Sequence, residues 1–545
     1  MSSLVASGSI GITAPNRLTN NILHRVLDRV DEYRDAPFLI DAGSGSMLTY
    51  GACDTIARGL AAELQRRGVR RASRVALLLK NSPEFALLYF GCLYLGAVVV
   101  PVDPGLHRRD VDAILQRSGA MLVIGSSATD APFDLAARER VGAAFWNVVP
   151  SSQRDTRTRD DGWSLGEPLA EPPADWSPFE GVTPNDLFAI NFTSGTTSVP
   201  KGVAHRIGGL LNNAVAFNEA MSFGPDSRFL HVFPMAYMAG FLNTLLSPFM
   251  AGASVVLAGR FGAQHALKFW DPVRRYGVNT LWLAPTMLAT LLHLDRDPSA
   301  PDYCRTRLRH VCVGTAPLPL AIKDAFERKY GTELLESYGL SELLFVSTNS
   351  RHAPRHDGSV GRPLPGVEIQ IGNEHGENAA LGADGDVRIK SAYCMVGYLD
   401  SDTSQPDALR DDWFPTGDIG HLSADGDLYI TGRAKDLIIR GGVNVSPRAI
   451  EDALLEHAAV AEAAVIGLPH EFYGEEIVAV LKLKAGHALP IIALSLEAFC
   501  KERLAVASRP DRFVEVTAFP VSISGKIQKA KLRQHLVEDS TQSTP

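Results

Sequence analysis

The chain has 545 residues, of which 46% are apolar and 21% are charged, and its formal net charge is −8. This length exceeds what one compact core accommodates, so we expect more than one domain. The composition is typical of a globular enzyme and excludes wholesale disorder. Acidic and basic residues are interspersed, and no Lys/Arg block with interleaved aromatic residues occurs, which argues against a nucleic-acid partner.

The six cysteines are scattered and form no CxxC pair. This favours reduced, mostly buried thiols in a cytoplasmic protein over a disulfide framework or a zinc site. The first residues lack the basic start and long apolar core of a signal peptide. Residues 85–102 are uncharged over 18 positions, close to membrane-spanning length. Because Gly91, Gly96 and Pro101 interrupt them, we predict a helix and a buried strand instead of a membrane span.

From about residue 48, helix-like and strand-like segments alternate. Apolar spacing predicts helices at 50–67 and 84–95, and aliphatic runs predict strands at 74–79 and 97–102. Further apolar strands are predicted to begin at Ser254, Thr280 and His310. This alternation indicates an α/β fold with largely parallel sheets. The segment 151–178, rich in Arg, Asp, Pro and Ser, is predicted to be an exposed loop.

A second cycle of elements follows the turn-rich run 425–436. It is predicted to contain a helix at 447–456, strands at 461–466 and 477–484, a helix at 492–504 and a strand at 512–516. We therefore predict two domains. A large N-terminal domain of layered α/β subdomains comprises residues 1–434, and a small C-terminal α+β domain comprises residues 435–545.

A polar run follows the apolar segment 187–190, and it consists of Thr193, Ser194, Gly195, Thr196, Thr197, Ser198, Val199, Pro200, Lys201 and Gly202. Small hydroxyl residues around a glycine let backbone N–H and side-chain O–H groups surround a polyphosphate, and a lysine adds positive charge. The run is not a Walker A loop, because GxxxxGK[ST] is absent. A surface Ser/Thr turn is the alternative interpretation.

Two other runs carry carboxylates in suitable contexts. In Tyr338-Gly-Leu-Ser-Glu342 an aromatic ring can stack on a purine, and the carboxylate can ligate phosphate-bound Mg²⁺. Asp418, at the end of the turn Trp413-Phe-Pro-Thr-Gly-Asp, is suited to accept hydrogen bonds from two ribose hydroxyls. Taken singly, the first run also fits a turn before a capped helix, and the second fits an ordinary β-turn aspartate.

Together these runs resemble, in order and spacing from about Thr49 to Arg533, the signature blocks of the adenylate-forming superfamily. That superfamily contains acyl-CoA synthetases, adenylation domains of nonribosomal peptide synthetases and firefly luciferase, and the chain is most similar to acyl- or aryl-CoA ligases. The resemblance implies ATP, Mg²⁺ and coenzyme A as cofactors, and a mobile C-terminal domain. Departures occur at Ser198, where glycine is usual, at Ser341, where threonine is usual, and at Tyr237, where acyl-CoA synthetases often have histidine.

The resemblance also implies roles for single residues. Tyr338 would pack on adenine, Glu342 would hold Mg²⁺, and Asp418 and Arg433 would contact ribose or phosphate. Thr193, Glu342 and Lys526 are implied to be catalytic. The residues implied to bind ATP or coenzyme A are Thr193, Ser194, Gly195, Thr196, Thr197, Lys201, Gly314, Thr315, Ala316, Pro317, Ser337, Tyr338, Gly339, Ser341, Asp418, Ile430, Arg433, Lys435, Gly441, Gly442 and Lys526.

Two implied roles belong to the C-terminal domain. Lys526, in the block Pro520-Val-Ser-Ile-Ser-Gly-Lys, would bridge the substrate carboxylate and the α-phosphate or ribose oxygens. Without the resemblance, a lysine on an exposed loop is ordinarily just solvated charge. The domain would then rotate about Lys435 and present the Gly441–Gly442 strand to the thiol step, with a β-bulge as the alternative interpretation of these glycines.

The acid pocket is expected near 233–243, a run without Asp, Glu, Lys or Arg. A charged tail would stay unpaired there, which is costly. We therefore expect a neutral acid, either aryl or cinnamoyl-like, or medium-chain aliphatic. The candidate substrate residues are Tyr237, Met238, Phe241, Val313, Gly314, Leu343 and Leu344, and core packing explains the apolar ones equally well.

Three other functions remain open at the level of sequence. The first is an acyl-AMP ligase that delivers to an amine or to a carrier-protein thiol; no carrier domain follows Arg533, so that partner would be a separate protein. The second is a luciferase-like oxidoreductase, in which the adenylate reacts with oxygen. The third is a non-catalytic binding protein, which the presence of the charged residues named above disfavours.

Overall fold

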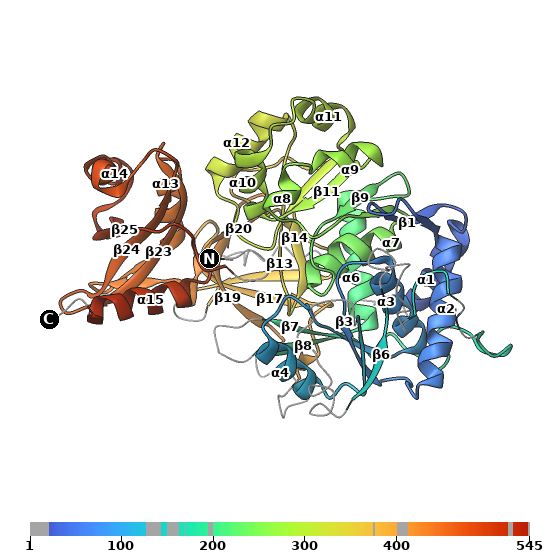
Figure 1. Cartoon of the computed structure of the whole chain (residues 1–545). Helices are drawn as coiled ribbons and strands as arrows, with labels where there is room; N and C mark the ends of the chain where they lie inside the picture. The colour runs from blue at the N-terminus through green and yellow to red at the C-terminus, as the bar shows by residue number, and fades with distance from the viewer. Residues whose placement is uncertain are drawn as a thin grey trace, which may run out of the picture.

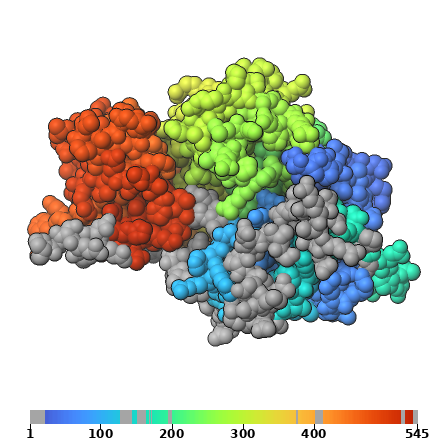
Figure 2. Space-filling view, in the orientation of Figure 1, coloured from blue at the N-terminus to red at the C-terminus, as the bar shows by residue number. Residues whose placement is uncertain are grey.

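The computed structural model describes residues 21–126, 143–149, 163–167, 169, 171–193, 200–373, 377–399, 412–521 and 527–542. Four sheets organise this part of the chain, and the orange and red C-terminal elements form a separate lobe beside the larger N-terminal part (Figures 1 and 2). The mixed α/β architecture, with a large N-terminal and a smaller C-terminal part, confirms the predicted fold class.

A seven-stranded sheet has the order β18-β8-β7-β4-β3-β5-β6. Its strands are β3 (Arg74–Leu78), β4 (Val98–Pro101), β5 (Leu122–Gly125), β6 (Ala144–Asn147), β7 (Leu187–Thr193), β8 (Lys201–Arg206) and β18 (Gly397–Tyr398). Its central strands are parallel, as the alternating pattern predicted, whereas β7 and β8 form an antiparallel hairpin.

A nine-stranded sheet has the order β15-β14-β13-β12-β11-β9-β10-β1-β2. Its strands are β1 (Pro37–Asp41), β2 (Met47–Thr49), β9 (Arg228–His231), β10 (Ser254–Leu257), β11 (Thr280–Leu283), β12 (His310–Val313), β13 (Leu335–Leu340), β14 (Leu344–Thr348) and β15 (Arg362–Pro363). The strands predicted at Ser254, Thr280 and His310 are therefore confirmed, and they run parallel to their neighbours.

Helices pack around these two sheets (Figure 1). They are α1 (Ile22–Glu32), α2 (Tyr50–Arg66), α3 (Pro83–Leu95), α4 (Arg108–Ser118), α6 (Ile207–Met221), α7 (Ser247–Met250), α8 (Ala263–Ala266), α9 (Trp270–Arg275), α10 (Pro285–Leu294), α11 (Ala300–Arg307) and α12 (Leu320–Tyr330). The predicted helices at 50–67 and 84–95 correspond to α2 and α3.

Local sequence explains how the helix α3 begins and ends. The Ser82 hydroxyl accepts from the backbone N–H of Phe85, Pro83 occupies the first turn, and Gly96 ends the helix with φ of 68°. All its residues are buried, so residues 85–102 are a core helix followed by the strand β4. Among the described residues, every helix is too short or too polar to span a bilayer.

The C-terminal part begins after a four-stranded antiparallel sheet of β16 (Val367–Gly372), β17 (Gly385–Ser391), β19 (Phe414–Leu422) and β20 (Leu428–Arg433). It contains β21 (Ile438–Arg440), β22 (Val443–Val445), α13 (Pro447–Leu455), β23 (Val460–His470), β24 (Gly474–Leu483), α14 (Leu489–Arg503), β25 (Arg512–Glu515) and α15 (Lys529–Gln542). The helices and strands predicted in this second cycle are confirmed. Its apolar clusters run from Ile438 onward, and the division at 434/435 stays a prediction.

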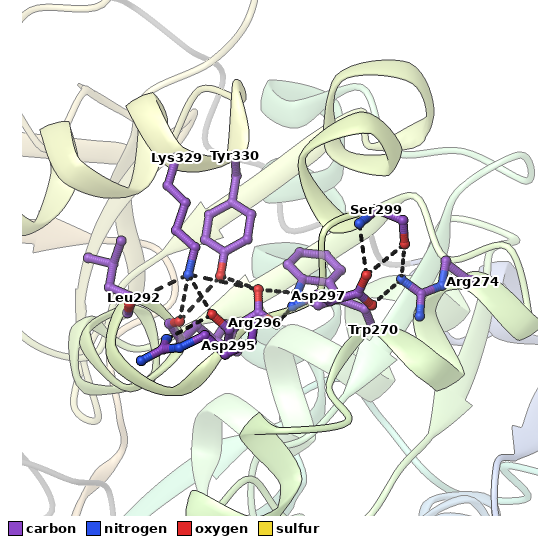
Figure 3. A network of polar contacts seen from close by, with 10 residues as sticks. Trp270, Arg274, Leu292, Asp295, Arg296, Asp297, Ser299, Lys329 and Tyr330 are labelled. Atoms are coloured by element: carbon purple, nitrogen blue, oxygen red, sulfur yellow. Dashed lines mark hydrogen bonds and ion pairs between the residues drawn. The ribbon is translucent and has the colours of Figure 1, made fainter.

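A buried polar network fixes the corner between α9, α10 and α12 (Figure 3). Asp295 is 2% exposed and accepts from Trp270 Nε1 at 3.0 Å and from the Tyr330 hydroxyl at 2.7 Å. The Lys329 ammonium donates to backbone carbonyls at the end of α10, including that of Leu291 at 3.2 Å. Because protein groups satisfy the buried carboxylate, this network is structural.

Candidate functional site

The predicted phosphate loop connects the two strands of the β7–β8 hairpin. Thr193 pairs with Lys201 in the register, and the Thr193 hydroxyl donates to the Lys201 carbonyl at 3.5 Å. Ser194, Gly195, Thr196, Thr197 and Ser198 lie outside the described residues. The hairpin therefore brings the two ends of the loop together and leaves the exposed Lys201 at its base.

One tyrosine, Tyr398, contacts both Lys201 and Glu342, the predicted magnesium ligand. The Lys201 ammonium is 5.1 Å from the ring centroid of Tyr398, which is within cation–π range. The Tyr398 hydroxyl donates to Glu342 Oε1 at 2.9 Å. Burial and the Glu342 carboxylate raise the pKa of Tyr398, so its phenol stays protonated and acts as a donor at neutral pH. Sequence reasoning missed Tyr398.

The backbone before Glu342 is held by a buried histidine that sequence reasoning also missed. His205 Nε2 lies 2.6 Å from the Ser341 carbonyl oxygen. Burial lowers the pKa of His205 to about 4, so the ring is neutral, and its Nε2–H donates because a carbonyl can only accept. The Glu342 carbonyl accepts from the backbone N–H of Met395 at 2.7 Å.

Tyr338 and Asp418 are joined directly, although 80 residues separate them. The Tyr338 hydroxyl donates to Asp418 Oδ2 at 2.5 Å, and Arg433 Nε donates to Asp418 Oδ1 at 2.6 Å. Asp418 is 2% exposed. Burial and the neighbouring carboxylate hold the pKa of Tyr338 well above its usual range. The strands β19 and β20 place Asp418 opposite Arg433 in their register, so the structure brings these three predicted residues together.

The turn after β12 carries the predicted adenine and acid loop. Thr315 adopts φ of 73°, a left-handed conformation that costs free energy for a residue other than glycine. A Cβ added at Gly314 would lie 3.2 Å from the Ser337 carbonyl oxygen, which brings this loop against β13. Ala316 and Pro317 continue the same turn before α12. Close approach to β13 and backbone strain together distinguish this turn from an ordinary strand-to-helix connection.

Two further predicted residues, Gly339 and Ser337, lie on β13, the first strand of the hairpin β13–β14. A Cβ at Gly339 would lie 2.2 Å from the Leu344 carbonyl oxygen, so only glycine fits at this bulge. The Ser337 hydroxyl is 3.0 Å from the Thr348 hydroxyl, within hydrogen-bonding distance. Leu343 is fully buried. The turn at 341–343 then carries the chain from β13 to β14, and Glu342 lies in that turn.

The predicted acid-pocket run folds into the π-helix η2 (Ala239–Leu246), a conformation often found at functional sites. Gly240 permits it, because a Cβ there would lie 2.0 Å from the Pro234 carbonyl oxygen. Phe241 stacks on Tyr89 with ring centroids 4.2 Å apart, so it packs into the core. Tyr237 is partly buried and Met238 is 7% exposed. Phe241, Tyr237 and Met238 stay predictions as substrate contacts.

The C-terminal candidates occupy separate places. Gly441 and Gly442, with φ of 58° and 81°, form the turn between β21 and β22, and no atom would meet a Cβ at Gly442. Lys435 lies in the short 3₁₀ helix η3 (Ala434–Asp436), and Ile430 lies on β20. Lys526 lies outside the described residues.

Comparisons with known proteins decide which family contains this arrangement. A family model described as AMP-binding enzyme matches residues 26–399, and another, described as AMP-binding enzyme C-terminal domain, matches residues 449–526. The chain belongs to the AMP-binding enzyme family. Together with its similarity to named CoA ligases, this makes it an AMP-forming acid–thiol ligase. ATP and coenzyme A are substrates of that class.

Relatives of this AMP-binding enzyme match it over most of its length. The sulfoacetate–CoA ligase of Cupriavidus necator is 31% identical over 519 residues, which cover 93% of this chain and 96% of the relative. The oxalate–CoA ligase of Arabidopsis thaliana is 30% identical, and the match covers 89% of this chain and 92% of the relative. The crystal structure of ATP-bound MatB from Rhodopseudomonas palustris superposes with a TM-score of 0.83 at 26% identity, over 95% of this chain and 98% of that one.

A magnesium ion fits the acidic group present in this AMP-binding enzyme. Mg²⁺ in nucleotide sites is held by one or two carboxylates together with substrate phosphates and waters, not by a protein cage. Glu342 supplies one carboxylate, and only its Oε1 is bonded to Tyr398. Within the described ranges, no three His, Cys, Asp or Glu side chains gather into a metal-binding group. The donor set thus suits a metal that arrives with the nucleotide.

Proposed function

We propose that the enzyme joins a neutral carboxylic acid to coenzyme A through an acyl-adenylate. The substrate carboxylate attacks the α-phosphorus of ATP and displaces pyrophosphate, and the coenzyme A thiol then attacks the acyl carbon and releases AMP. The observation that carries the proposal is that the hairpin β13–β14 bears two of the predicted site residues. Tyr338, on β13, donates to Asp418, which also accepts from Arg433. Glu342, in the turn of the hairpin, accepts from Tyr398, whose ring lies beside the Lys201 ammonium.

Asp418 is proposed to hold the ribose. A carboxylate has about four lone-pair positions, and the Tyr338 hydroxyl and Arg433 Nε use two of them. The remaining positions can accept from the two ribose hydroxyls. The Tyr338 ring, held by its hydrogen bond to Asp418, is proposed to stack on the purine. The nucleoside part of ATP is thus proposed to be held by Asp418 and Tyr338 together.

Charge is the main difficulty of the first step, because an anion approaches a polyanion. Electrostatic stabilisation and positioning are therefore the main means of catalysis. Thr193 and Lys201 are proposed to hold the phosphates, and Glu342 is proposed to hold the metal. The bound metal would neutralise phosphate charge as it gathers on the bridging oxygen.

Lys526 is proposed to bridge the attacking carboxylate and the α-phosphate, and to leave the site when the C-terminal domain rotates about Lys435. Lys526→Ala should lower the rate of adenylate formation ~10²–10³-fold, as the loss of one transition-state donor does. It should largely spare thioester formation from synthetic acyl-AMP. Equal losses in both half-reactions, measured separately by quenched flow, would overturn the rotation.

The neutral acid is supported by the run 233–243, which contains no charged residue, and by the burial of Met238 beside the π-helix. A sulfonate or second carboxylate would need a cation there to compensate its desolvation. The names of the sulfoacetate and oxalate ligases point to charged acids, so a charged acid is the competing substrate class.

A panel of acids tests the proposal. Pyrophosphate release is measured with benzoate, cinnamate, octanoate, sulfoacetate, oxalate and malonate, each with and without coenzyme A. We expect release with at least one neutral acid and thioester only when coenzyme A is present. Preference for sulfoacetate, oxalate or malonate would contradict the neutral pocket. Acid-dependent release with no thioester would contradict coenzyme A as acceptor and favour a carrier-protein thiol or an amine.

A further inference from the structure

One tyrosine outside the predicted site connects two of its charged groups. Tyr398 is the last residue of β18, and it pairs with Val203 of β8, two residues from Lys201. Its hydroxyl donates to Glu342 Oε1 at 2.9 Å, and the Lys201 ammonium lies 5.1 Å from its ring centroid. The same side chain therefore touches the residue proposed for the metal and the residue proposed for the phosphates.

The backbone on both sides of this contact is fixed. The backbone N–H of Leu399 donates to the Gly202 carbonyl at 2.8 Å, and that of Val396 donates to the Ala204 carbonyl at 2.8 Å. The Glu342 carbonyl accepts from the N–H of Met395 at 2.7 Å. Segment 395–399 is thus anchored to β8 and to Glu342 at once. The backbone that carries Tyr398 is therefore held beside the backbone of Glu342.

From this geometry we infer that Tyr398 is a positioning residue for the magnesium carboxylate. By holding Oε1 of Glu342, Tyr398 restricts the rotation of the carboxylate, and Oε2 would remain available to a metal that arrives with ATP. Mg²⁺ requires near-ideal octahedral geometry, so the orientation of a single protein carboxylate matters more than for a larger cation. Outer-shell hydrogen bonds of this kind typically change metal affinity by about 10–100-fold. The inference rests on the proposed role of Glu342.

The ring and the hydroxyl of Tyr398 have separable tasks. The ring face attracts the Lys201 ammonium, and the hydroxyl binds Glu342. Tyr398→Phe removes the second contact and keeps the first. The variant therefore tests the carboxylate contact without disturbing the cation over the ring, and the unchanged ring volume keeps the packing intact.

The test is calorimetric and needs no turnover. Binding of α,β-methylene-ATP, which cannot release pyrophosphate, is titrated with Mg²⁺ and again with EDTA. We expect Tyr398→Phe to reduce the Mg²⁺-dependent gain in affinity about tenfold and to leave the affinity in EDTA unchanged. The matched control is Tyr393→Phe, five residues before Tyr398. Its hydroxyl donates to the Pro365 carbonyl at 2.6 Å, so the substitution should change neither affinity.

Glu342→Gln separates this inference from the proposed function. If Glu342→Gln keeps the full Mg²⁺-dependent gain, Glu342 does not hold the metal, and the proposed role of Glu342 and this inference both fail. If Glu342→Gln abolishes the gain while Tyr398→Phe preserves it, only the positioning role is overturned. A tenfold loss in Tyr398→Phe with complete loss in Glu342→Gln, and none in Tyr393→Phe, supports both.

Discussion

Replacing Asp418 by asparagine tests whether one carboxylate organises the nucleoside side of the site. Its two oxygens accept from the Tyr338 hydroxyl at 2.5 Å and from Arg433 Nε at 2.6 Å. Asparagine keeps one acceptor oxygen and turns an amide toward the other donor. The asparagine can keep its oxygen on Arg433 Nε and donate its N–H to the Tyr338 hydroxyl oxygen, so two charge-assisted hydrogen bonds are replaced by weaker ones to an uncharged amide.

The magnitude follows from the burial of each group. A hydrogen bond to a charged group contributes about 1.5–3 kcal/mol and one between neutral groups about 0.5–1.5 kcal/mol, so the exchange at Tyr338 costs about 1–1.5 kcal/mol. The Arg433 side chain is 46% exposed, so water screens its unpaired charge, and the ion pair adds less than about 1 kcal/mol. We expect Asp418→Asn to lower the free energy of unfolding by about 1–3 kcal/mol. Loss of a charged acceptor for ribose should weaken ATP binding about 10–100-fold.

The assay combines urea denaturation with calorimetric titration of ATP. The matched control is Asp384→Asn beside the same antiparallel sheet, where a 49% exposed carboxylate pairs with His421 Nδ1 at 2.7 Å. Asp384→Asn should therefore lower the free energy of unfolding by only about 0.5 kcal/mol and leave the ATP affinity unchanged. The reasoning is refuted if Asp418→Asn costs no more stability than Asp384→Asn, or if it binds ATP as tightly as the unmodified enzyme.

Two further predictions concern the acid-pocket region. Gly240→Ala places a Cβ 2.0 Å from the Pro234 carbonyl oxygen and should lower the free energy of unfolding, measured by urea denaturation, by at least about 2 kcal/mol. In the control Gly209→Ala the nearest neighbour of the new Cβ is 3.7 Å away, so this substitution should be neutral or stabilising. Equal losses in the two variants would argue against the steric explanation. Burial lowers the pKa of His231 to about 4, so between pH 6.5 and 4 the unfolded chain binds a proton that the folded chain excludes, and stability falls as pH falls, by up to about 1.4 kcal/mol per unit. In His231→Gln the slope of the free energy of unfolding against pH should fall by the equivalent of about one proton. If the variant and the unmodified enzyme gave parallel curves of this free energy against pH, His231 would not be the cause of the pH dependence.

Much of the fold was predictable because the signals are local. Short aliphatic runs such as that of β10, which is buried throughout, favour central strands of a covered sheet. Ser82, Pro83 and Gly96 mark the ends of α3 in the sequence itself. The π-helix at Ala239 was not predicted, because its apolar residues are buried all round and leave no helical periodicity to read.

The site was predictable only where a residue belongs to a motif. Tyr338 and Asp418 lie in separate motifs, yet their direct hydrogen bond follows from strand register across 80 residues. Tyr398 and His205 belong to no recognisable motif. Tyr398 lies in a two-residue strand and His205 in a buried strand, and their contacts with Glu342 and Ser341 form only when β8 and β18 pack beside the turn that holds Glu342. Contacts between distant segments are properties of the packed chain and leave little trace in local pattern.

The acyl-adenylate is the central claim, and the position of one oxygen atom tests it most directly. An acid that supports turnover is supplied with ¹⁸O in its carboxylate, and the products with ATP and coenzyme A are analysed by mass spectrometry. If the carboxylate attacks the α-phosphorus and the thiol then attacks the acyl carbon, one labelled oxygen must end in AMP, with none in pyrophosphate. Label in inorganic phosphate together with formation of ADP, or AMP without label, would contradict the account.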